Sequence, residues 1–199
     1  MNKDTYIENR SKLMNSVEDN SVMILFAGKP AKKTGDEFYQ FTPDKNFYYL
    51  TGIQEDGHLV VLSKYNNIVS EKLFLTDLDL DKEMWSGKTL RDFEGKEISG
   101  INDVSYMKEF TSYLNVLIKG KEKVNLYLDL DREEFEESDS VSNRFAKEII
   151  SKYPHINIKN FTSIIAPLRM VKSENEIKEM RKVIEITIEG VKSVSYTHL

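Results

Sequence analysis

The apolar run Val22-Met23-Ile24-Leu25-Phe26-Ala27 limits the choice of fold more than any other stretch of this sequence. A strand with one face in water alternates apolar and polar side chains, whereas this run contains no polar residue. A continuous run of this length is typical of a strand that is buried on both faces. The sheet that contains it therefore needs a layer of other elements on each side. The run is far too short to span a bilayer, and we expect no membrane partner.

Strand and helix patterns alternate along the rest of the sequence. The strands predicted from apolar or aromatic runs lie at residues 47–50, 59–62, 73–75, 104–106, 124–128 and 156–158. The helices predicted from apolar spacing lie at residues 4–17, 108–118 and 140–152, with a helical turn at 81–85. Alternation of this kind predicts the α/β class, with a mixed sheet flanked by helices.

A last helix follows a domain boundary that we predict near residues 166–169. Ser173 and Glu176 have the spacing of a capping box, with Ser173 as the N-cap. An apolar stripe then follows at Ile177, Met180, Ile184, Ile188 and Val191. We expect residues 1–167 to form the first domain, and residues 168–192 to be a linker and the first helix of a second domain that is missing from the sequence. Residues 193–199 lose the amphipathic pattern, and we interpret them as a non-native tail.

The charge and the cysteine content exclude several classes of protein. A net charge of -5 argues against nucleic acid as a partner, because nucleic-acid binding needs a basic surface. The sequence has no cysteine, which excludes thiolate chemistry, disulfides and cysteine-ligated metals. The polar N-terminus lacks the apolar core of a signal peptide. We therefore expect a cytoplasmic protein.

No set of residues has the spacing of a metal site. The three histidines, His58, His155 and His198, are far apart, and none has a helical partner for a ligand pair. We interpret His58 and His155 as surface or boundary residues. The acidic alternation that begins at Asp77 resembles the start of a calcium loop, but that loop needs glycine and glutamate at positions where this sequence has lysine. We expect no metal ligand in this sequence.

The sequence also lacks a recognisable catalytic motif. Gly87-Lys88-Thr89 matches only the end of a phosphate-binding loop, because the first glycine of that loop would fall at Lys82. No serine lies in a Gly-x-Ser-x-Gly elbow. Trp85, the only tryptophan, is the one candidate site residue, as a core anchor, an interface residue or a side chain that contacts a ligand. We expect no catalytic residue in the chain.

Three motifs, in their order and spacing, give the sequence a resemblance to one family. They are the segment Phe47-Tyr48-Tyr49-Leu50-Thr51-Gly52, the segment Glu83-Met84-Trp85-Ser86-Gly87, and an Arg-x-x-Lys-Ser-x-x-Glu-Ile segment at residues 169–177. With these motifs the sequence resembles the N-terminal domain of the aminopeptidase P family, the Xaa-Pro aminopeptidases. The resemblance implies a chain that is truncated before the pita-bread catalytic domain of that family.

The resemblance implies a metal-dependent hydrolase that removes an N-terminal residue preceding proline. Its substrate would be a peptide with proline at the second position, and two manganese ions in the catalytic domain would activate the attacking water. The manganese ligands would lie beyond residue 199, so the chain itself would bind no metal and would be inactive alone. The N-terminal domain would wall the substrate cleft and build homodimers or homotetramers. Trp85 would contact the substrate or a neighbouring subunit.

Two other interpretations of the resemblance remain open. An Xaa-Pro dipeptidase shares this type of N-terminal domain and is distinguished by its action on dipeptides rather than longer substrates. A non-catalytic peptide-binding module would carry a degenerate catalytic domain instead. Both alternatives depend on sequence beyond residue 199.

Overall fold

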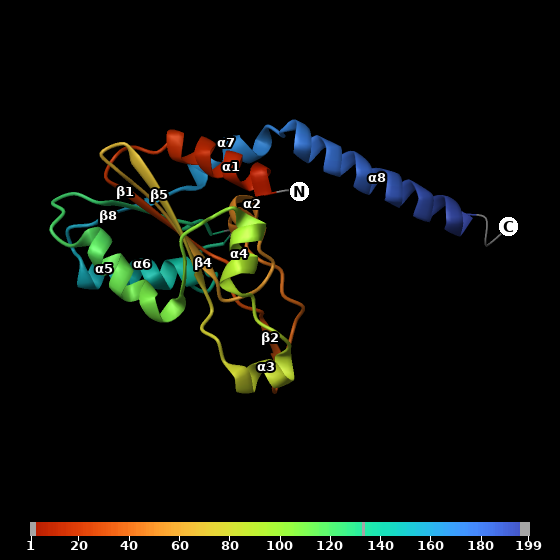
Figure 1. Ribbon diagram of the computed structural model, residues 1–199, viewed down its shortest axis with the longest axis horizontal. Coiled ribbons are helices and arrows are strands. Elements are labelled where there is room, and N and C mark those ends of the chain that lie inside the picture. Colours follow the sequence, from red (N-terminus) through yellow and green to blue (C-terminus); the bar gives the residue numbers. More distant parts are fainter. Residues whose placement is uncertain (1–2, 133, 196–199) are drawn as a thin grey trace.

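The computed structural model describes residues 3–132 and 134–195 (Figure 1). The main sheet has six strands: β1 (Ser21–Phe26), β4 (Leu59–Tyr65), β5 (Ile68–Leu75), β6 (Val104–Tyr106), β7 (Asn125–Leu128) and β8 (Asn157–Asn160). Two short strands form a separate hairpin, β2 (Lys32–Thr34) and β3 (Glu37–Phe38). The helices are α1 (Lys3–Asn15), α2 (Lys45–Thr51), α3 (Leu80–Ser86), α4 (Asp92–Ser99), α5 (Phe110–Ile118), α6 (Val141–Lys152), α7 (Thr162–Met170) and α8 (Glu174–Ser195), with a 3-10 turn η1 (Met107–Glu109) before α5.

The order of strands in the main sheet is β6-β5-β4-β1-β7-β8. β1 pairs antiparallel with β4 and parallel with β7, so the sheet is mixed, as predicted. A tight turn joins β4 to β5, and its residues Asn66 and Asn67 both have positive φ angles, 52° and 60°. Asparagine tolerates this backbone conformation, which matches the right-handed twist of a hairpin. The two asparagines therefore form a tight reversing turn between the two strands.

Helices cover both faces of the sheet, and β1 is buried between them. Val22 and Ile24 lie in a core cluster with residues of α5 and α6, whereas Met23 and Leu25 lie in a second cluster with residues of α1, α2 and α7. Figure 1 shows α1 and α7 on one side of the sheet and α5 and α6 on the other. The expectation of a strand buried on both faces, within an α/β fold, is confirmed.

The strand predicted at residues 47–50 is wrong, because these residues form helix α2. Asp44 is the N-cap: its Oδ1 accepts hydrogen bonds from the backbone N–H groups of Asn46 at 2.9 Å and Phe47 at 2.8 Å. Gly52 ends the helix in the left-handed conformation, and its N–H donates to the Tyr48 carbonyl at 2.8 Å. The residues interpreted as a turn before a strand are thus the cap of a short helix.

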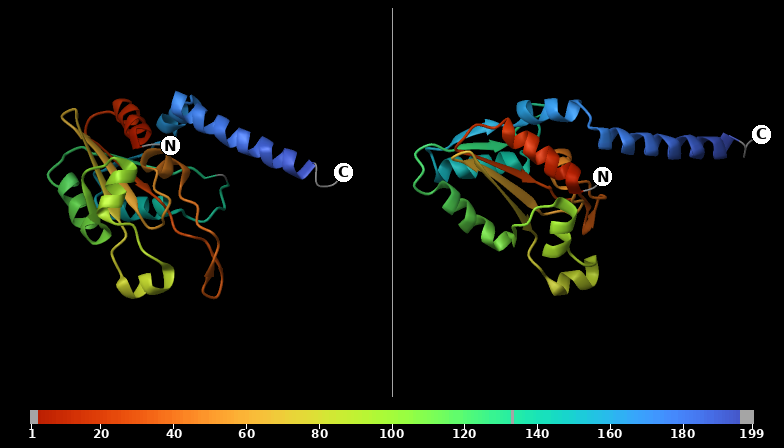
Figure 2. Two further views of the ribbon diagram at one scale, coloured as in Figure 1. Left: turned by 45° about the vertical axis from the view of Figure 1, so that its right-hand side comes forward. Right: turned by 45° about the horizontal axis from the view of Figure 1, so that its top comes forward.

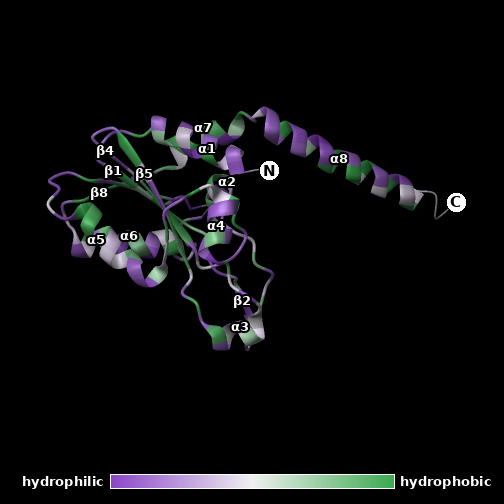
Figure 3. Ribbon diagram, in the orientation of Figure 1, coloured by the Kyte–Doolittle hydropathy of each residue, from purple (hydrophilic) through white to green (hydrophobic). Residues whose placement is uncertain are grey.

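Helix α8 begins as predicted and then leaves the body of the molecule. The N–H of Ser173 donates to Glu176 Oε2 at 2.8 Å, and the N–H of Glu176 donates to Ser173 Oγ at 3.3 Å, which is the predicted capping box. Figure 2 shows α8 projecting away from the sheet in two further views. None of its described residues is buried, and hydrophobic residues recur along it in Figure 3.

Both boundaries of the predicted domains fall inside helices of the structure. The predicted boundary at residues 166–169 lies inside α7, and the chain leaves helical structure only between Met170 and Glu174. Of the tail predicted at residues 193–199, residues 193–195 continue α8, and residues 196–199 lie outside the described residues. The division into domains stays a prediction. Within the described part of the chain, no helix is long and apolar enough to cross a membrane.

Candidate functional site

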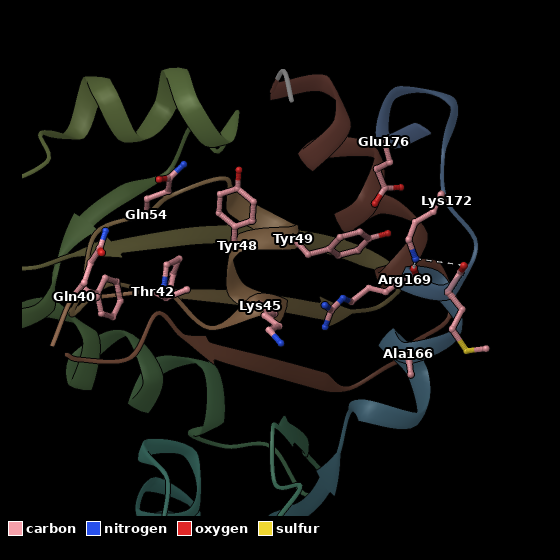
Figure 4. A pocket seen from close by; sticks show the side chains of 13 residues that line it. Gln40, Thr42, Lys45, Tyr48, Tyr49, Gln54, Ala166, Arg169, Lys172 and Glu176 are labelled. Carbon is pink, nitrogen blue, oxygen red and sulfur yellow. Dashed lines mark hydrogen bonds between the residues drawn. The ribbon is translucent and has the colours of Figure 1, made fainter. Parts of the chain in front are cut away.

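The motif at residues 47–52 and the motif at residues 169–177 meet in space although they lie more than a hundred residues apart. They line a pocket of about 830 Å³, which we call the junction pocket (Figure 4). Lys45, Tyr48 and Tyr49 come from α2. On the other side, Arg169 comes from α7, Lys172 from the connection that follows it, and Glu176 from the start of α8. The volume lies within the range of pockets that bind small molecules or short peptide segments.

Two direct hydrogen bonds join α2 to α7 beside this pocket. The hydroxyl of Tyr49 donates to the Leu168 carbonyl at 3.3 Å, and Nη1 of Arg169 donates to Oδ1 of Asn46 at 2.6 Å. Tyr49 is buried, and this burial, with a smaller contribution from the charge of Glu176, raises the pKa of its hydroxyl. The hydroxyl therefore stays protonated and can act as a donor.

Two carboxylates, those of Asp44 and Asp129, lie near the contact between Arg169 and Asn46. Nδ2 of Asn46 donates to Oδ2 of Asp129 at 2.9 Å, which places the end of β7 against the start of α2. Burial raises the pKa of Asp44, and the nearby charge of Asp129 adds to that rise. The backbone N–H groups that Asp44 caps and the charge of Arg169 oppose the rise. The polar groups around the pocket thus hold one another and fix the orientation of α7.

The described residues form no cluster that could bind a metal ion. Among the described residues, no three histidine, cysteine, aspartate or glutamate side chains lie together in a way that could hold a metal ion. His155 is exposed beside Tyr153, with ring centroids 6.4 Å apart. His198 lies outside the described residues. The chain therefore does not offer, within the described ranges, the ligand set that a manganese centre would need.

The interpretation of His58 as a surface or boundary residue is wrong. Its side chain is 1% exposed, and Nδ1 accepts a hydrogen bond from the N–H of Thr76 at 3.0 Å. Burial lowers the pKa of the imidazole to about 4, and the charge of Asp56 opposes that shift only in part. His58 is therefore a neutral ring that accepts a backbone hydrogen bond.

Trp85 lies on α3, far from the core, and its side chain is 90% exposed. That exposure rules out the interpretation as a core anchor and leaves the two contact roles as predictions. Met84 beside it is also exposed. An exposed tryptophan with an apolar neighbour is typical of a surface that contacts another molecule.

Sequence reasoning missed Asn46 as the residue that connects α2 to Arg169 of the second motif. Its amide contacts both Arg169 and Asp129, at positions far along the chain. Arg169 was recognised only as part of a motif, and nothing in the local pattern indicated its partner. The Asp44 cap would have been the available signal, because it predicts a helix in which Asn46 and Tyr49, three residues apart, lie on the same face.

Comparisons with known proteins agree with this architecture. The family model described as "Aminopeptidase P, N-terminal domain" matches residues 6–127. The chain is 24% identical over 188 residues to an Xaa-Pro aminopeptidase from Haemophilus influenzae, covering 94% of this chain and 41% of that protein. It is likewise 24% identical to the Xaa-Pro aminopeptidase from Escherichia coli, with coverage of 94% and 43%.

A solved structure from Bacillus anthracis, assigned to aminopeptidase P, superposes with a TM-score of 0.91 at 36% identity, covering 96% of this chain and 46% of that one. The aminopeptidase P from Escherichia coli in its low-pH form has the same fold, with a TM-score of 0.76 at 20% identity over 92% of this chain. The chain spans less than half the length of these relatives. The chain therefore belongs to the aminopeptidase P family and matches its N-terminal domain.

Proposed function

We propose that this chain is the N-terminal domain of an Xaa-Pro aminopeptidase, an enzyme that releases an N-terminal residue preceding proline. The observation that carries the proposal is the match to the Bacillus anthracis structure, which extends over 96% of the chain at 36% identity. The relatives from Haemophilus influenzae and Escherichia coli carry the name Xaa-Pro aminopeptidase. The substrate would be a peptide with proline at its second position.

The proposed contribution of this chain is binding and assembly rather than chemistry. Its relatives are more than twice as long, so the proposal assigns the catalytic site to a second domain. That domain would supply two manganese ions that activate the attacking water. The described residues of this chain include no group that could hold a metal ion, so we assign no step of the reaction to them.

The junction pocket and Trp85 are the parts of the chain that we propose to serve the longer enzyme. The pocket lies where α7 leads into α8, and it would form part of the wall of the substrate cleft. Trp85 would contact the substrate or a neighbouring subunit of a homodimer or homotetramer, because its side chain is almost fully exposed. The cysteine-free sequence is consistent with a cytoplasmic enzyme.

The first test uses the 199-residue chain alone. We expect no cleavage of peptides with proline at the second position when manganese is added, because the proposed catalytic site is absent. The control is the Bacillus anthracis protein, assayed at the same concentration on the same peptides. Proline-dependent cleavage by the purified chain, surviving removal of contaminating peptidases, would contradict the proposal.

The second test gives the chain a catalytic domain. In a chimera, this chain is fused within α8 to the C-terminal part of the Bacillus anthracis protein. The fusion lies where the α8 sequences of the two proteins align. We expect the chimera to cleave peptides with proline at the second position and to leave peptides with alanine there intact. The same C-terminal part without an N-terminal domain is the control. A folded chimera that shows no preference for proline, beside an active parent enzyme, would refute the proposal.

A further inference from the structure

Trp85 lies in the segment that connects β5 to α4 and projects from the sheet. We call residues 77–89 the arm; it contains α3 and the exposed side chains of Leu80, Met84 and Trp85. Figure 1 shows α3 at the far end of this segment, away from the six-stranded sheet. The residues that flank the arm, Thr76 and Leu90, are held by one short turn of the chain.

The beginning of the arm is fastened at His58 and Asp56. The N–H of Thr76 donates to Nδ1 of His58 at 3.0 Å, and the hydroxyl of Thr76 donates to the Asp56 carbonyl at 3.2 Å. Gly57 lies between the two acceptors with φ 77°, and a Cβ there would lie 2.7 Å from Oγ1 of Thr76. Only glycine allows the turn and Thr76 to approach this closely.

The end of the arm is fastened at Glu55, in the same turn. The N–H of Leu90 donates to Oε2 of Glu55 at 3.0 Å, and the side chain of Leu90 is buried in the core. The same carboxylate oxygen lies 3.9 Å from Nε2 of His58. Four consecutive residues, 55–58, therefore hold both ends of the arm.

The chemistry of His58 suits this task. Because Nδ1 accepts a hydrogen bond, the neutral ring carries its proton on Nε2. In the described part of the chain, Nε2 has no hydrogen-bond partner, so the polar contacts of the ring are made to Thr76, where the arm begins. The side chain of His58 is completely buried. A buried acceptor with a fixed ring is a rigid anchor for a backbone N–H group.

Glu83 of α3 connects the arm to the residues that follow it. Oε1 of Glu83 accepts from the N–H of Thr89 at 3.0 Å, and Oε2 of Glu83 accepts from Nη2 of Arg91 at 2.7 Å. The first bond joins α3 to the last residue of the arm, and the second joins α3 to the residue just before α4. Besides the bond to Arg91, two further contacts of the arm lie outside the turn. The N–H of Lys108 donates to Oδ1 of Asp77 at 3.2 Å, and Nζ of Lys88 donates to Oε1 of Glu94 in α4 at 2.6 Å. The direction of α3 is then set by how the two ends of the arm are held.

We propose that Glu55 and His58 are positioning residues that fasten the two ends of the arm and so determine where Trp85 is presented. The importance of this position for the enzyme rests on the proposed contact role of Trp85. The fastening itself is measurable without catalysis, because Trp85 is the only tryptophan of the sequence. Its fluorescence therefore reports on the arm alone.

The test compares matched variants of the 199-residue chain. Glu55→Ala and His58→Leu remove the acceptors, whereas Glu55→Gln and His58→Asn keep an oxygen that can accept the same N–H. Time-resolved fluorescence anisotropy of Trp85 measures the motion of the arm, and hydrogen exchange measures the protection of the Thr76 and Leu90 amides. Amides of β1 serve as the internal control for the stability of the whole domain.

We expect Glu55→Ala and His58→Leu to lower the residual anisotropy of Trp85. The Leu90 amide should exchange about tenfold faster in the first variant, and the Thr76 amide about tenfold faster in the second. The amides of β1 should stay protected, and Glu55→Gln and His58→Asn should resemble the unchanged chain. If His58→Leu does not fold, the Glu55 pair decides alone, because the Glu55 side chain is 46% exposed and its loss leaves the core intact.

Three results would overturn the proposal. In the first, the anisotropy of Trp85 would stay unchanged while the amides exchange faster. In the second, the amides would keep their protection. In the third, the conservative variants would behave like Glu55→Ala and His58→Leu. The first result would assign the fastening to another contact, such as that between Asp77 and Lys108. A chimera that fails to cleave Xaa-Pro peptides would refute the proposed function and would leave these measurements unaffected.

Discussion

Nε of Arg10 donates to Oε2 of Glu71 at 2.9 Å, so that a fully buried cation in α1 pairs with a carboxylate in β5. Nη1 of the same guanidinium donates to the carbonyls of Leu50 at 2.6 Å and Ser99 at 2.9 Å. These carbonyls belong to the last turns of α2 and α4, where helix carbonyls lack partners and the helix dipole is negative. One cation therefore joins three helices to the sheet.

Replacing Arg10 should destabilise the domain strongly. Arg10→Met removes the only side chain that reaches Glu71, Leu50 and Ser99 together, so buried carbonyls lose their donor. We expect the free energy of unfolding to fall by about 3 kcal/mol or more. Urea denaturation measures it. The matched control is Lys12→Met in the same helix, which removes an exposed pair with Glu8 and should cost about 0.5 kcal/mol or less. Similar losses for the two variants would contradict the prediction.

His58 should make the stability depend on pH. The pKa of His58 is about 4 in the folded chain and about 6.5 in the unfolded chain, since burial disfavours the charged ring. Between these values the unfolded chain binds a proton that the folded chain does not, so stability falls as the pH falls from 6.5 to 4. The full loss is on the order of 3 kcal/mol.

The measurement for His58 is urea unfolding at several pH values in this window, with His58→Asn as the control. Glu55 and Asp56, the carboxylates that face the ring, are present in both proteins. The difference between the two proteins isolates the histidine. The same slope of stability against pH in both would show that His58 does not cause it.

Gly52 should not tolerate a side chain. Its φ is 72°, and a Cβ would lie 2.3 Å from Cε2 of the buried ring of Tyr6. We expect Gly52→Ala to lower the free energy of unfolding by more than about 2 kcal/mol. Gly35→Ala is the control, because Gly35 also has a positive φ, 53°, and a Cβ there would meet no atom within 4 Å. It should cost about 1 kcal/mol, the backbone strain alone. Equal costs would show that the contact with Tyr6 yields without strain.

Helices α2 and α7 should be coupled in energy through Asn46 and Arg169. Asn46→Ala and Arg169→Ala each break the 2.6 Å hydrogen bond between them, so the double variant should lose less stability than the sum of the two. We expect a coupling of about 1 kcal/mol, measured by urea unfolding of the four proteins. Arg169→Ala with Asn143→Ala is the control cycle, since no hydrogen bond connects these residues among those described, and it should be additive. Additivity in both cycles would contradict the coupling.

The fold was predictable where the local pattern is sufficient, and β1 is the best example. Its six residues carry their own signal for burial on both faces. Two helices were missed because each contains a residue that breaks the pattern. Gly95 lies inside α4, where a Cβ would lie 3.1 Å from Cδ2 of Leu73, so the glycine serves close packing on the sheet. Pro167 lies inside α7 and was interpreted as part of a boundary.

The error at α2 has a different physical reason. A proline and an aspartate before aromatic residues are equally consistent with a turn into a strand and with the cap of a helix. Phe47 and Leu50 are both fully buried, on one side of a helix. Packing in the core, rather than local preference, therefore decides between strand and helix here. The site was less predictable still. The partners of His58 and Asn46 lie 18 and more residues away, and local patterns carry no information about such pairs.

The exposed apolar stripe of α8 should make the 199-residue chain associate in solution. Met180, Ile184 and Ile188 lie at four-residue spacing, and each is about half exposed, so association would remove apolar surface from water. We expect sedimentation velocity to show assemblies that dissociate on roughly hundredfold dilution. Ile184→Glu should shift the chain to a monomer. Lys182→Gln on the opposite face changes the net charge by the same amount and should leave association unchanged. A chain that stays monomeric at every concentration would show that α8 is tolerated in water without a partner.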